Sequence, residues 1–237
     1  MITLALDTSE SRGSIAVRRD GHTAAVRLHE GTTDYSSWLL GAAEEALREA
    51  SATMDSVALL AASTGPGSFT GVRVGLTTVK AWAEVYGKSV VGVSRLEAMA
   101  RVGERSGLVA PCYDAQRGQM FGGLYRWEEE GSKAVESEMV ISPEGFVAFV
   151  EKHAGENPVR WITLDPELIT SAPNWGTRER RGDRLIACPA DVASLIGELA
   201  EERAKLGRFS DPLELDANYV RRSDAEIFWK GPASGAR

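Results

Sequence analysis

Apolar and polar positions alternate along the first hundred residues in a way that predicts strands and helices in turn. Apolar runs without a helical period indicate strands, and apolar side chains three and four residues apart indicate helices. The expected elements are strands within residues 2–28 with a turn at Asp20-Gly21, a helix at 35–50 with Asp34 as its N-cap, a strand at 57–62, a helix at 71–87, and a strand at 90–93 that ends in a Ser94 cap. This order predicts a sheet with parallel members covered by helices.

Beyond residue 101 the pattern predicts a second, smaller lobe. The expected elements are strand-like pieces at 109–114, 119–127 and 134–142, a helix starting at Ser142-Pro143-Glu144, strands at 161–165 and 185–189, and an amphipathic helix at 191–206. We therefore expect an α/β protein with an N-terminal lobe at 1–101, a smaller C-terminal lobe at 102–215, a segment at 216–230 that packs back on the first lobe, and a tail at 231–237.

The two lobes begin alike. LALDTSESRGSIAV and PCYDAQRGQMFGGLY each place an aspartate, Asp7 or Asp114, between an apolar strand and a turn that contains glycine. A repeated hairpin of this kind resembles the one with which actin-like and sugar-kinase ATPases hold phosphate and Mg²⁺ between their lobes. The alternative is that Asp7 only caps its own turn.

Glycines and a proline crowd the stretch ASTGPGSFTGVRVGLTTVK at residues 62–80. The spacing of Gly65, Gly67 and Gly71 matches neither the Walker motif nor the dinucleotide-binding motif. Backbone N–H groups at the start of the following helix can attract an anion. The favoured interpretation is that Gly71 and Gly75, one turn apart, allow the helix to approach another element closely.

The helix at 71–87, which Ser68 or Thr70 is expected to cap, has more apolar surface than one sheet face requires. Its charged residues share one narrow stripe, so apolar side chains lie on two sides of it. In the helix at 35–50, Trp38 and Ala42 also lie off the main apolar stripe. Either the two helices form a joint patch for another chain, or the protein's own second lobe buries the surplus.

Composition limits the classes of partner. The chain of 237 residues is 43% hydrophobic and carries a net charge of −7, which argues against a broad basic face for nucleic acid. Four arginines offer a local alternative for tRNA, but two acidic residues interrupt the run and favour a solvated loop. The arginines are Arg178, Arg180, Arg181 and Arg184.

Neither the start of the chain nor its cysteines indicate secretion. We see no signal peptide and no apolar run long enough to span a membrane. Cys112 and Cys188 lie outside any CxxC spacing, which predicts two small buried hydrophobes without a disulfide or zinc site. We expect a cytoplasmic protein.

No catalytic or metal-binding constellation is evident. His22, His29 and His153 lack the spacing that presents two imidazoles to one metal. The GPGSFTG stretch does not match the G-x-S-x-G turn of serine hydrolases. We therefore predict no catalytic residue and no metal site, and interpret each histidine as a surface or turn residue.

Several stretches together resemble the bacterial TsaB (YeaZ) family of the Gcp-like, or peptidase M22, superfamily. In order they are MITLALDTSESRGSIAV, STGPGSFTGVRVGLTTVKAWA, VGVSRLEAMA, YDAQRGQMFGGLY and NYVRR, and GPGSFTGVRVGL is the most specific. The resemblance implies an actin-like ATPase (ASKHA, ribonuclease H-like) fold with a reduced C-terminal lobe. It also implies a role in forming N6-threonylcarbamoyladenosine (t6A) beside the anticodon of tRNA.

In that family the chain is a non-catalytic subunit that binds a TsaD-like transferase, and a TsaE-like ATPase joins the complex. The resemblance further implies a homodimer when the chain is alone, tRNA contact only through the complex, and no membrane. The alternative function is a small ATPase or kinase that uses the Asp7 hairpin and the Gly65–Thr70 loop. No cofactor is expected beyond weak ATP or ADP binding.

Three groups of site residues follow from this interpretation. The expected partner interface is Trp38, Ala42, Gly71, Val72, Gly75, Leu76, Thr78, Val79 and Trp82, and the vestigial phosphate site is Asp7, Thr8, Ser9, Gly65, Gly67 and Ser68. The expected loop of the second lobe is Asp114, Arg117 and Gly118. Two departures from the family pattern are Tyr35-Ser36-Ser37 in place of His-Ser-Glu, and the run from Gln116 to Phe121, which lacks the usual glutamate.

Overall fold

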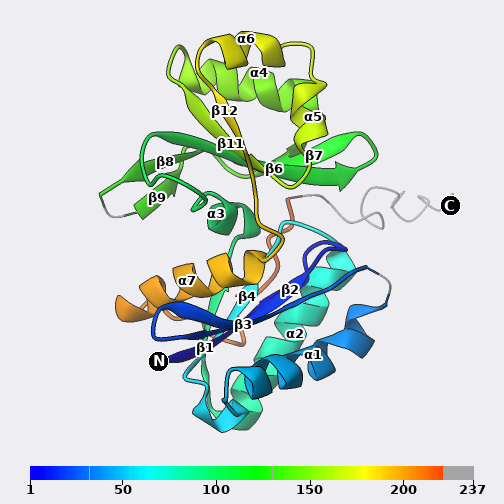
Figure 1. Ribbon diagram of the computed structural model, residues 1–237, viewed down its shortest axis with the longest axis vertical. Coiled ribbons are helices and arrows are strands. Elements are labelled where there is room, and N and C mark those ends of the chain that lie inside the picture. The colour runs from blue at the N-terminus through cyan, green and yellow to red at the C-terminus, as the bar shows by residue number, and fades with distance from the viewer. Residues whose placement is uncertain (32, 130, 221–237) are drawn as a thin grey trace, which may run out of the picture.

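The computed structural model describes residues 1–220 except residues 32 and 130. Figure 1 shows two α/β lobes, one above the other, with helices α3 and α7 between them. The first lobe has a five-stranded sheet in the order β3-β2-β1-β4-β5. Its elements are β1 (Ile2–Asp7), β2 (Ser14–Arg19), β3 (His22–Leu28), α1 (Tyr35–Glu49), a 3-10 turn (Met54–Ser56), β4 (Leu59–Ser63), α2 (Phe69–Tyr86), β5 (Ser89–Val93) and α3 (Arg95–Met99).

The second lobe repeats this topology. Its strand order is β10-β7-β6-β11-β12, and β8 also pairs with β6 and β9. In both lobes the first hairpin is antiparallel and its first strand starts a run of parallel pairs. The elements are β6 (Leu108–Gln116), β7 (Gln119–Gly122), β8 (Tyr125–Glu128), β9 (Gly131–Ala134), β10 (Met139–Ile141), α4 (Pro143–Ala154), β11 (Val159–Thr163), α5 (Pro166–Thr170), α6 (Trp175–Arg180), β12 (Arg184–Ala187) and α7 (Val192–Lys205).

The second lobe is reduced at one point of this repeat. Between its two parallel strands β11 and β12 the chain forms only α5 and α6, of 5 and 6 residues. The corresponding connection in the first lobe, between β4 and β5, is the 18-residue helix α2. The predicted α/β fold with a smaller C-terminal lobe is confirmed.

Helix α7 lies within the sequence range expected for the second lobe but packs on the sheet of the first. Figure 1 shows it across the face of that sheet opposite α1 and α2. Val192 and Ile196 share a buried core with Ala5 of β1, and Arg18 of β2 forms a buried ion pair with Glu201 at 3.2 Å. The expected boundary at residue 215 therefore does not follow the packing, because the apolar stripe of α7 covers an open sheet face far back in the sequence.

Serine side chains cap the N-termini of three helices at positions that the sequence predicts. Ser68, Ser94 and Ser142 accept hydrogen bonds from the backbone N–H groups three residues ahead. Asp34 occupies the predicted N-cap position of α1, but its side chain makes no capping hydrogen bond there. The expected strand at 119–127 is divided at Gly122, where a Cβ atom would meet the ring of Phe146.

After α7 the chain returns along the first lobe. Ser210 forms a bridge to Val90 of the edge strand β5, and the backbone N–H of Asn218 donates to Thr64 at 2.7 Å. The rest of the expected C-terminal segment, and the tail at 231–237, lie outside the described residues. Within the described part of the chain, no helix combines the length and apolar character needed to cross a membrane.

Candidate functional site

The predicted partner interface on α1 and α2 is largely inside the first lobe. Six of its residues are buried, namely Ala42, Gly71, Val72, Gly75, Leu76 and Val79. Trp38, Thr78 and Trp82 are half-buried, and the Trp38 ring packs edge-on against His29. The six buried residues expose little surface in the isolated chain. Much of the surplus apolar surface belongs to the core beneath α1 and α2, and the assignment of these residues to a partner interface stays a prediction.

Gly71 and Gly75 allow α2 to lie very close to the hairpin between β1 and β2. A Cβ atom on Gly71 would lie 2.1 Å from the carbonyl oxygen of Thr8, and one on Gly75 would lie 2.4 Å from the Thr8 hydroxyl. The Thr8 hydroxyl donates to the carbonyl oxygen of Gly71 at 2.7 Å. The close approach predicted for these glycines is therefore real, but it is to the β1–β2 hairpin of the same chain.

A shallow groove of about 540 Å³ remains exposed between α1 and α2. Leu40 and Phe69 line it with 59% and 43% of their surface exposed. Farther along α2, Val85 and Tyr86 are also exposed. Sequence reasoning missed these side chains because the apolar pattern of a helix does not show which of its two apolar sides the sheet covers.

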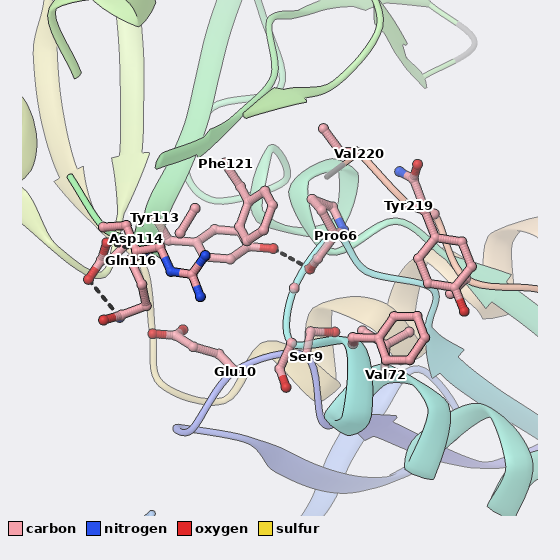
Figure 2. A pocket seen from close by; sticks show the side chains of 17 residues that line it. Ser9, Glu10, Pro66, Val72, Tyr113, Asp114, Gln116, Phe121, Tyr219 and Val220 are labelled. Atoms are coloured by element: carbon pink, nitrogen blue, oxygen red, sulfur yellow. Dashed lines mark hydrogen bonds between the residues drawn. The ribbon is translucent and has the colours of Figure 1, made fainter. Parts of the chain in front are cut away.

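The cleft between the lobes is the second candidate site. It contains a cavity of about 330 Å³, and Figure 2 shows the side chains around it. Ser9 and Glu10 come from the first hairpin, residues 66–69 from the glycine loop, residues 114–117 from the second hairpin, and residues 217–220 from the returning C-terminal segment. The structure thus brings the predicted phosphate site and the loop of the second lobe together.

The glycine loop uses its backbone groups for internal contacts. The N–H of Ser68 donates to the carbonyl oxygen of Ser9 at 2.7 Å, and the N–H of Gly65 donates to the Ser63 hydroxyl at 3.1 Å. A Cβ atom on Gly67 would lie 2.1 Å from the same Ser9 oxygen. The loop is therefore shaped to pack on the first hairpin.

Asp7 is fully buried and both of its carboxylate oxygens are occupied. Its Oδ1 accepts the N–H of Ser9 at 3.1 Å, as expected for a turn-capping aspartate. Its Oδ2 accepts the Nε–H of Arg95 at 2.9 Å. Arg95, the first residue of α3, is itself fully buried.

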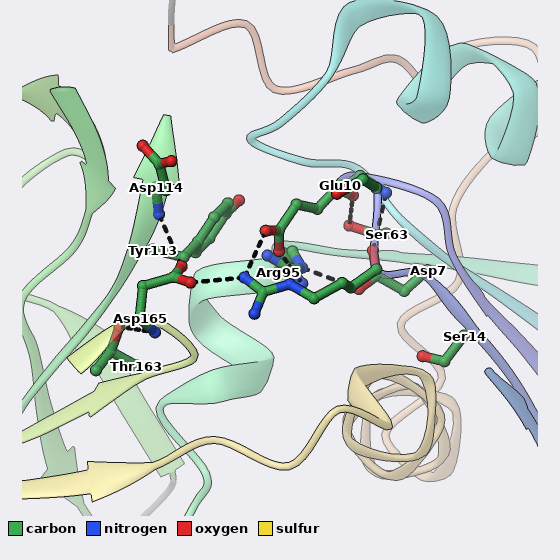
Figure 3. A network of polar contacts seen from close by, with 12 residues as sticks. Asp7, Glu10, Ser14, Ser63, Arg95, Tyr113, Asp114, Thr163 and Asp165 are labelled. Atoms are coloured by element: carbon green, nitrogen blue, oxygen red, sulfur yellow. Dashed lines mark hydrogen bonds and ion pairs between the residues drawn. The ribbon is translucent and has the colours of Figure 1, made fainter. Parts of the chain in front are cut away.

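The Arg95 guanidinium lies among three groups, shown in Figure 3. Besides Asp7, it has Nη2 at 3.0 Å from Oε2 of Glu10, and its carbon lies 4.2 Å from the centre of the Tyr113 ring. Burial by itself lowers the pKa of Arg95, but the interactions with Asp7, Tyr113 and Glu10 together outweigh burial and raise the pKa well above its ordinary value. Sequence reasoning missed Arg95 because one arginine at a helix start is usually exposed.

The second hairpin has a tight turn that Asp114 holds. Its carboxylate accepts the backbone N–H of Gln116 at 2.7 Å and the side-chain amide of the same residue at 2.8 Å. Gln116, Arg117 and Gly118 all have left-handed backbone conformations, with φ from 59° to 70°. The role that the sequence predicts for this loop in the fold agrees with this geometry, in which Asp114 caps its own turn as Asp7 does.

Several of the groups predicted to hold phosphate and magnesium are already engaged within this chain. The Asp7 carboxylate is enclosed and neutralised by Arg95, and the loop N–H groups of Gly65 and Ser68 already donate within the chain. A phosphate site needs free backbone N–H groups or side-chain cations. Within residues 1–220, apart from 32 and 130, no cluster of three or more histidine, cysteine, aspartate or glutamate side chains is arranged for a metal ion.

Arg178 and His29, two other residues considered from the sequence, are both buried. Arg178 is fully buried in an ion pair with Asp183 at 2.9 Å, so it cannot contact tRNA as part of a basic loop. His29, interpreted as a surface or turn residue, directly follows β3 and is buried between the carbonyl oxygens of Ser11 and Thr33, at 2.8 Å and 2.7 Å from its ring nitrogens.

Comparisons with known proteins match this architecture. The family model described as "TsaD: tRNA N6-adenosine threonylcarbamoyltransferase" matches residues 30–161. The chain is 33% identical to the tRNA threonylcarbamoyladenosine biosynthesis protein TsaB of Bacillus subtilis, over 97% of this chain and 98% of that protein. It is 29% identical to TsaB of Escherichia coli, over 93% and 96% of the two chains.

Solved structures agree with the sequence comparisons. A Pseudomonas aeruginosa protein described as similar to the peptidase YeaZ superposes with a TM-score of 0.71 and 25% identity, covering 93% of this chain and 99% of that one. The activator of 2-hydroxyisocaproyl-CoA dehydratase from Clostridium difficile, solved with bound ADPNP, superposes with a TM-score of 0.54 at 9% identity over 89% of this chain and 99% of that one. The second likeness shows the fold alone. Because the chain spans nearly the full length of its TsaB relatives, it belongs to the TsaB (YeaZ) family of tRNA threonylcarbamoyladenosine biosynthesis proteins.

Proposed function

We propose that this chain acts in t6A biosynthesis as a non-catalytic subunit that binds and activates a TsaD-like transferase through the exposed groove between α1 and α2. Family membership supports the pathway. The apolar side chains that stay exposed on these two helices support the contact. The interlobe cleft supports a non-catalytic role, because its carboxylate and loop N–H groups are engaged within the chain.

The groove has the chemistry of a protein interface. Leu40 and Phe69 line it and expose 59% and 43% of their surfaces, and Val85, farther along α2, exposes 74%. The Arg73 guanidinium lies 3.8 Å from the centre of the Phe69 ring and donates to the Tyr219 hydroxyl at 2.9 Å. Aromatic and arginine side chains around an apolar centre are typical of interface hot spots.

The match to the transferase family also bears on the partner. It covers residues 30–161, which include both groove helices. A partner with the same fold would present corresponding helices, so the two chains can pack in a pseudo-twofold arrangement. We also expect the isolated chain to form a homodimer through the same surface. The homodimer and the joining of a TsaE-like ATPase both remain predictions.

Leu40→Arg is the most direct test of this interface. It places a charge in the groove, and we expect the Kd for the TsaD-like protein to rise tenfold or more. Burying a leucine is worth roughly 1.5–3 kcal/mol, and about 1.4 kcal/mol is a factor of ten in Kd. Leu213→Arg is the matched control, because Leu213 is 88% exposed but lies on neither α1 nor α2.

Binding is measured by isothermal titration and activity by t6A formation on tRNA, with the TsaE-like ATPase added to all samples. Activity that needs both proteins and falls only in the Leu40→Arg sample supports the proposal. Equal binding by the Leu40 and Leu213 variants would remove the groove from the interface. ATP turnover by this chain alone, without partner-dependent t6A formation, would favour the alternative kinase or ATPase function.

A further inference from the structure

The two hairpins that face each other across the cleft are joined by one buried cation. Arg95, the first residue of α3 after β5, forms ion pairs with Asp7 and Glu10 of the first hairpin. Its guanidinium also stacks on Tyr113 of the second lobe. The Tyr113 hydroxyl in turn donates to the carbonyl oxygen of Pro66 in the glycine loop. One side chain therefore contacts both lobes through Glu10 and Tyr113, two residues that line the interlobe cavity.

The charges at this point are balanced within the chain. Asp7 and Arg95 are fully buried, and the Glu10 side chain is 13% exposed. Without the guanidinium, two carboxylates would face each other in a poorly solvated space, where like charges repel strongly. The positive charge of Arg95 thus fixes the first hairpin to the start of α3, and the stacking of the same guanidinium on Tyr113 extends the contact to the second lobe.

A second connection lies nearer the surface and runs in parallel. Arg12 of the first hairpin contacts Glu10 at 2.8 Å and Asp165 of the second lobe at 2.7 Å. Asp165 also accepts the backbone N–H of Asp114 at 3.2 Å. Figure 3 shows Asp165 and Glu10 on either side of this contact.

We propose that Arg95 is a built-in cation that holds the two lobes in one orientation, whether or not nucleotide is present. A protein of this fold that binds nucleotide between its lobes gains a ligand-dependent contact between them. In this chain the Arg95 side chain makes a contact between the lobes, so the contact needs no ligand. The arrangement of the lobes is then a fixed property of the isolated protein and does not depend on the proposed partner.

The test measures the distance between the lobes in the full-length chain by double electron–electron resonance. Spin labels are attached to Glu44→Cys on α1 and Ala148→Cys on α4, both exposed positions. The native Cys112 and Cys188 are buried, and burial raises the pKa of each to about 12. The thiolate is the reactive form, so labelling favours the introduced cysteines.

We expect one narrow distance distribution for the wild-type sequence, unchanged by Mg²⁺ with ATP. Arg95→Gln should add a second, longer distance. The matched control is Arg178→Gln, which removes an equally buried arginine whose ion pair lies entirely within the second lobe, and it should leave the distribution unchanged.

Arg95→Lys keeps the charge but loses the planar contact with Tyr113, and it serves if Arg95→Gln does not fold. For Arg95→Lys we also expect a longer distance to appear. A shift of the wild-type distribution on adding Mg²⁺ with ATP would overturn the proposal. So would an unchanged narrow distribution in a folded Arg95 variant, because the lobes would then be held without the guanidinium.

Discussion

Gly71→Ala tests whether α2 is held against the first hairpin as closely as the structure shows. In an ordinary helix interior, replacing glycine by alanine stabilises the protein by about 1 kcal/mol. Gly71 lies in α2, but its added methyl group would sit 2.1 Å from the carbonyl oxygen of Thr8, where ordinary contact begins at 3.4 Å. The helix or the hairpin must move by more than an ångström to admit it.

The expected magnitude follows from these opposing effects. Overpacking of a tight site costs about 1–3 kcal/mol, and the site here is at the severe end because the opposing atom is backbone. Subtracting the gain in helix propensity of about 1 kcal/mol leaves a net loss of about 2 kcal/mol. Any movement also strains the hydrogen bond from the Thr8 hydroxyl to Gly71.

Gly41→Ala is the matched control. Gly41 lies in the interior of α1, and a Cβ atom there would meet nothing within 4 Å. We expect this variant to gain about 0.5–1 kcal/mol. Urea unfolding of the isolated chain gives both free energies. If Gly71→Ala is as stable as Gly41→Ala, the close contact between α2 and the hairpin is refuted, and the glycines become available again as interface residues.

Two further predictions concern buried polar groups of the second lobe. Arg178→Met should lower the free energy of unfolding by about 3–5 kcal/mol, because it leaves the buried Asp183 carboxylate unpaired. Urea unfolding followed by tryptophan fluorescence measures this free energy. A loss smaller than that of an exposed arginine variant such as Arg180→Met would contradict the buried pair. Burial raises the pKa of Glu138 above 4.5, against hydrogen bonds from Ser94 and Tyr125. The native state therefore binds this proton more tightly than the unfolded state, and the stability that the proton contributes is present below pH 4.5 and lost as pH rises through the raised pKa. Glu138→Gln should remove that part of the pH dependence, and a pH series of unfolding measurements in which both proteins show the same slope would contradict the assignment.

The local order of elements could be predicted from sequence because it depends on short-range chemistry. Apolar spacing located α1 and α2, and serine side chains marked the starts of α2, α3 and α4. The repeat of a strand, an aspartate and a returning strand in the sequence alone indicated the duplicated topology that the strand order of the two sheets shows. The family resemblance rested on similar local stretches and is confirmed by relatives that match the whole chain.

What each face contacts was decided only by the tertiary structure. The spacing of Gly71 and Gly75 indicates a close approach but carries no information on whether the opposing atom belongs to this chain or to another, and here it is Thr8, 63 residues before Gly71. Arg95 looks like an exposed residue at the start of a short helix until two hairpins, distant in sequence, converge on it. Helix α7 covers a sheet formed by the start of the chain. Periodicity depends on neighbouring residues and is readable from sequence, whereas burial and ion pairing depend on long-range contacts that only the folded chain creates.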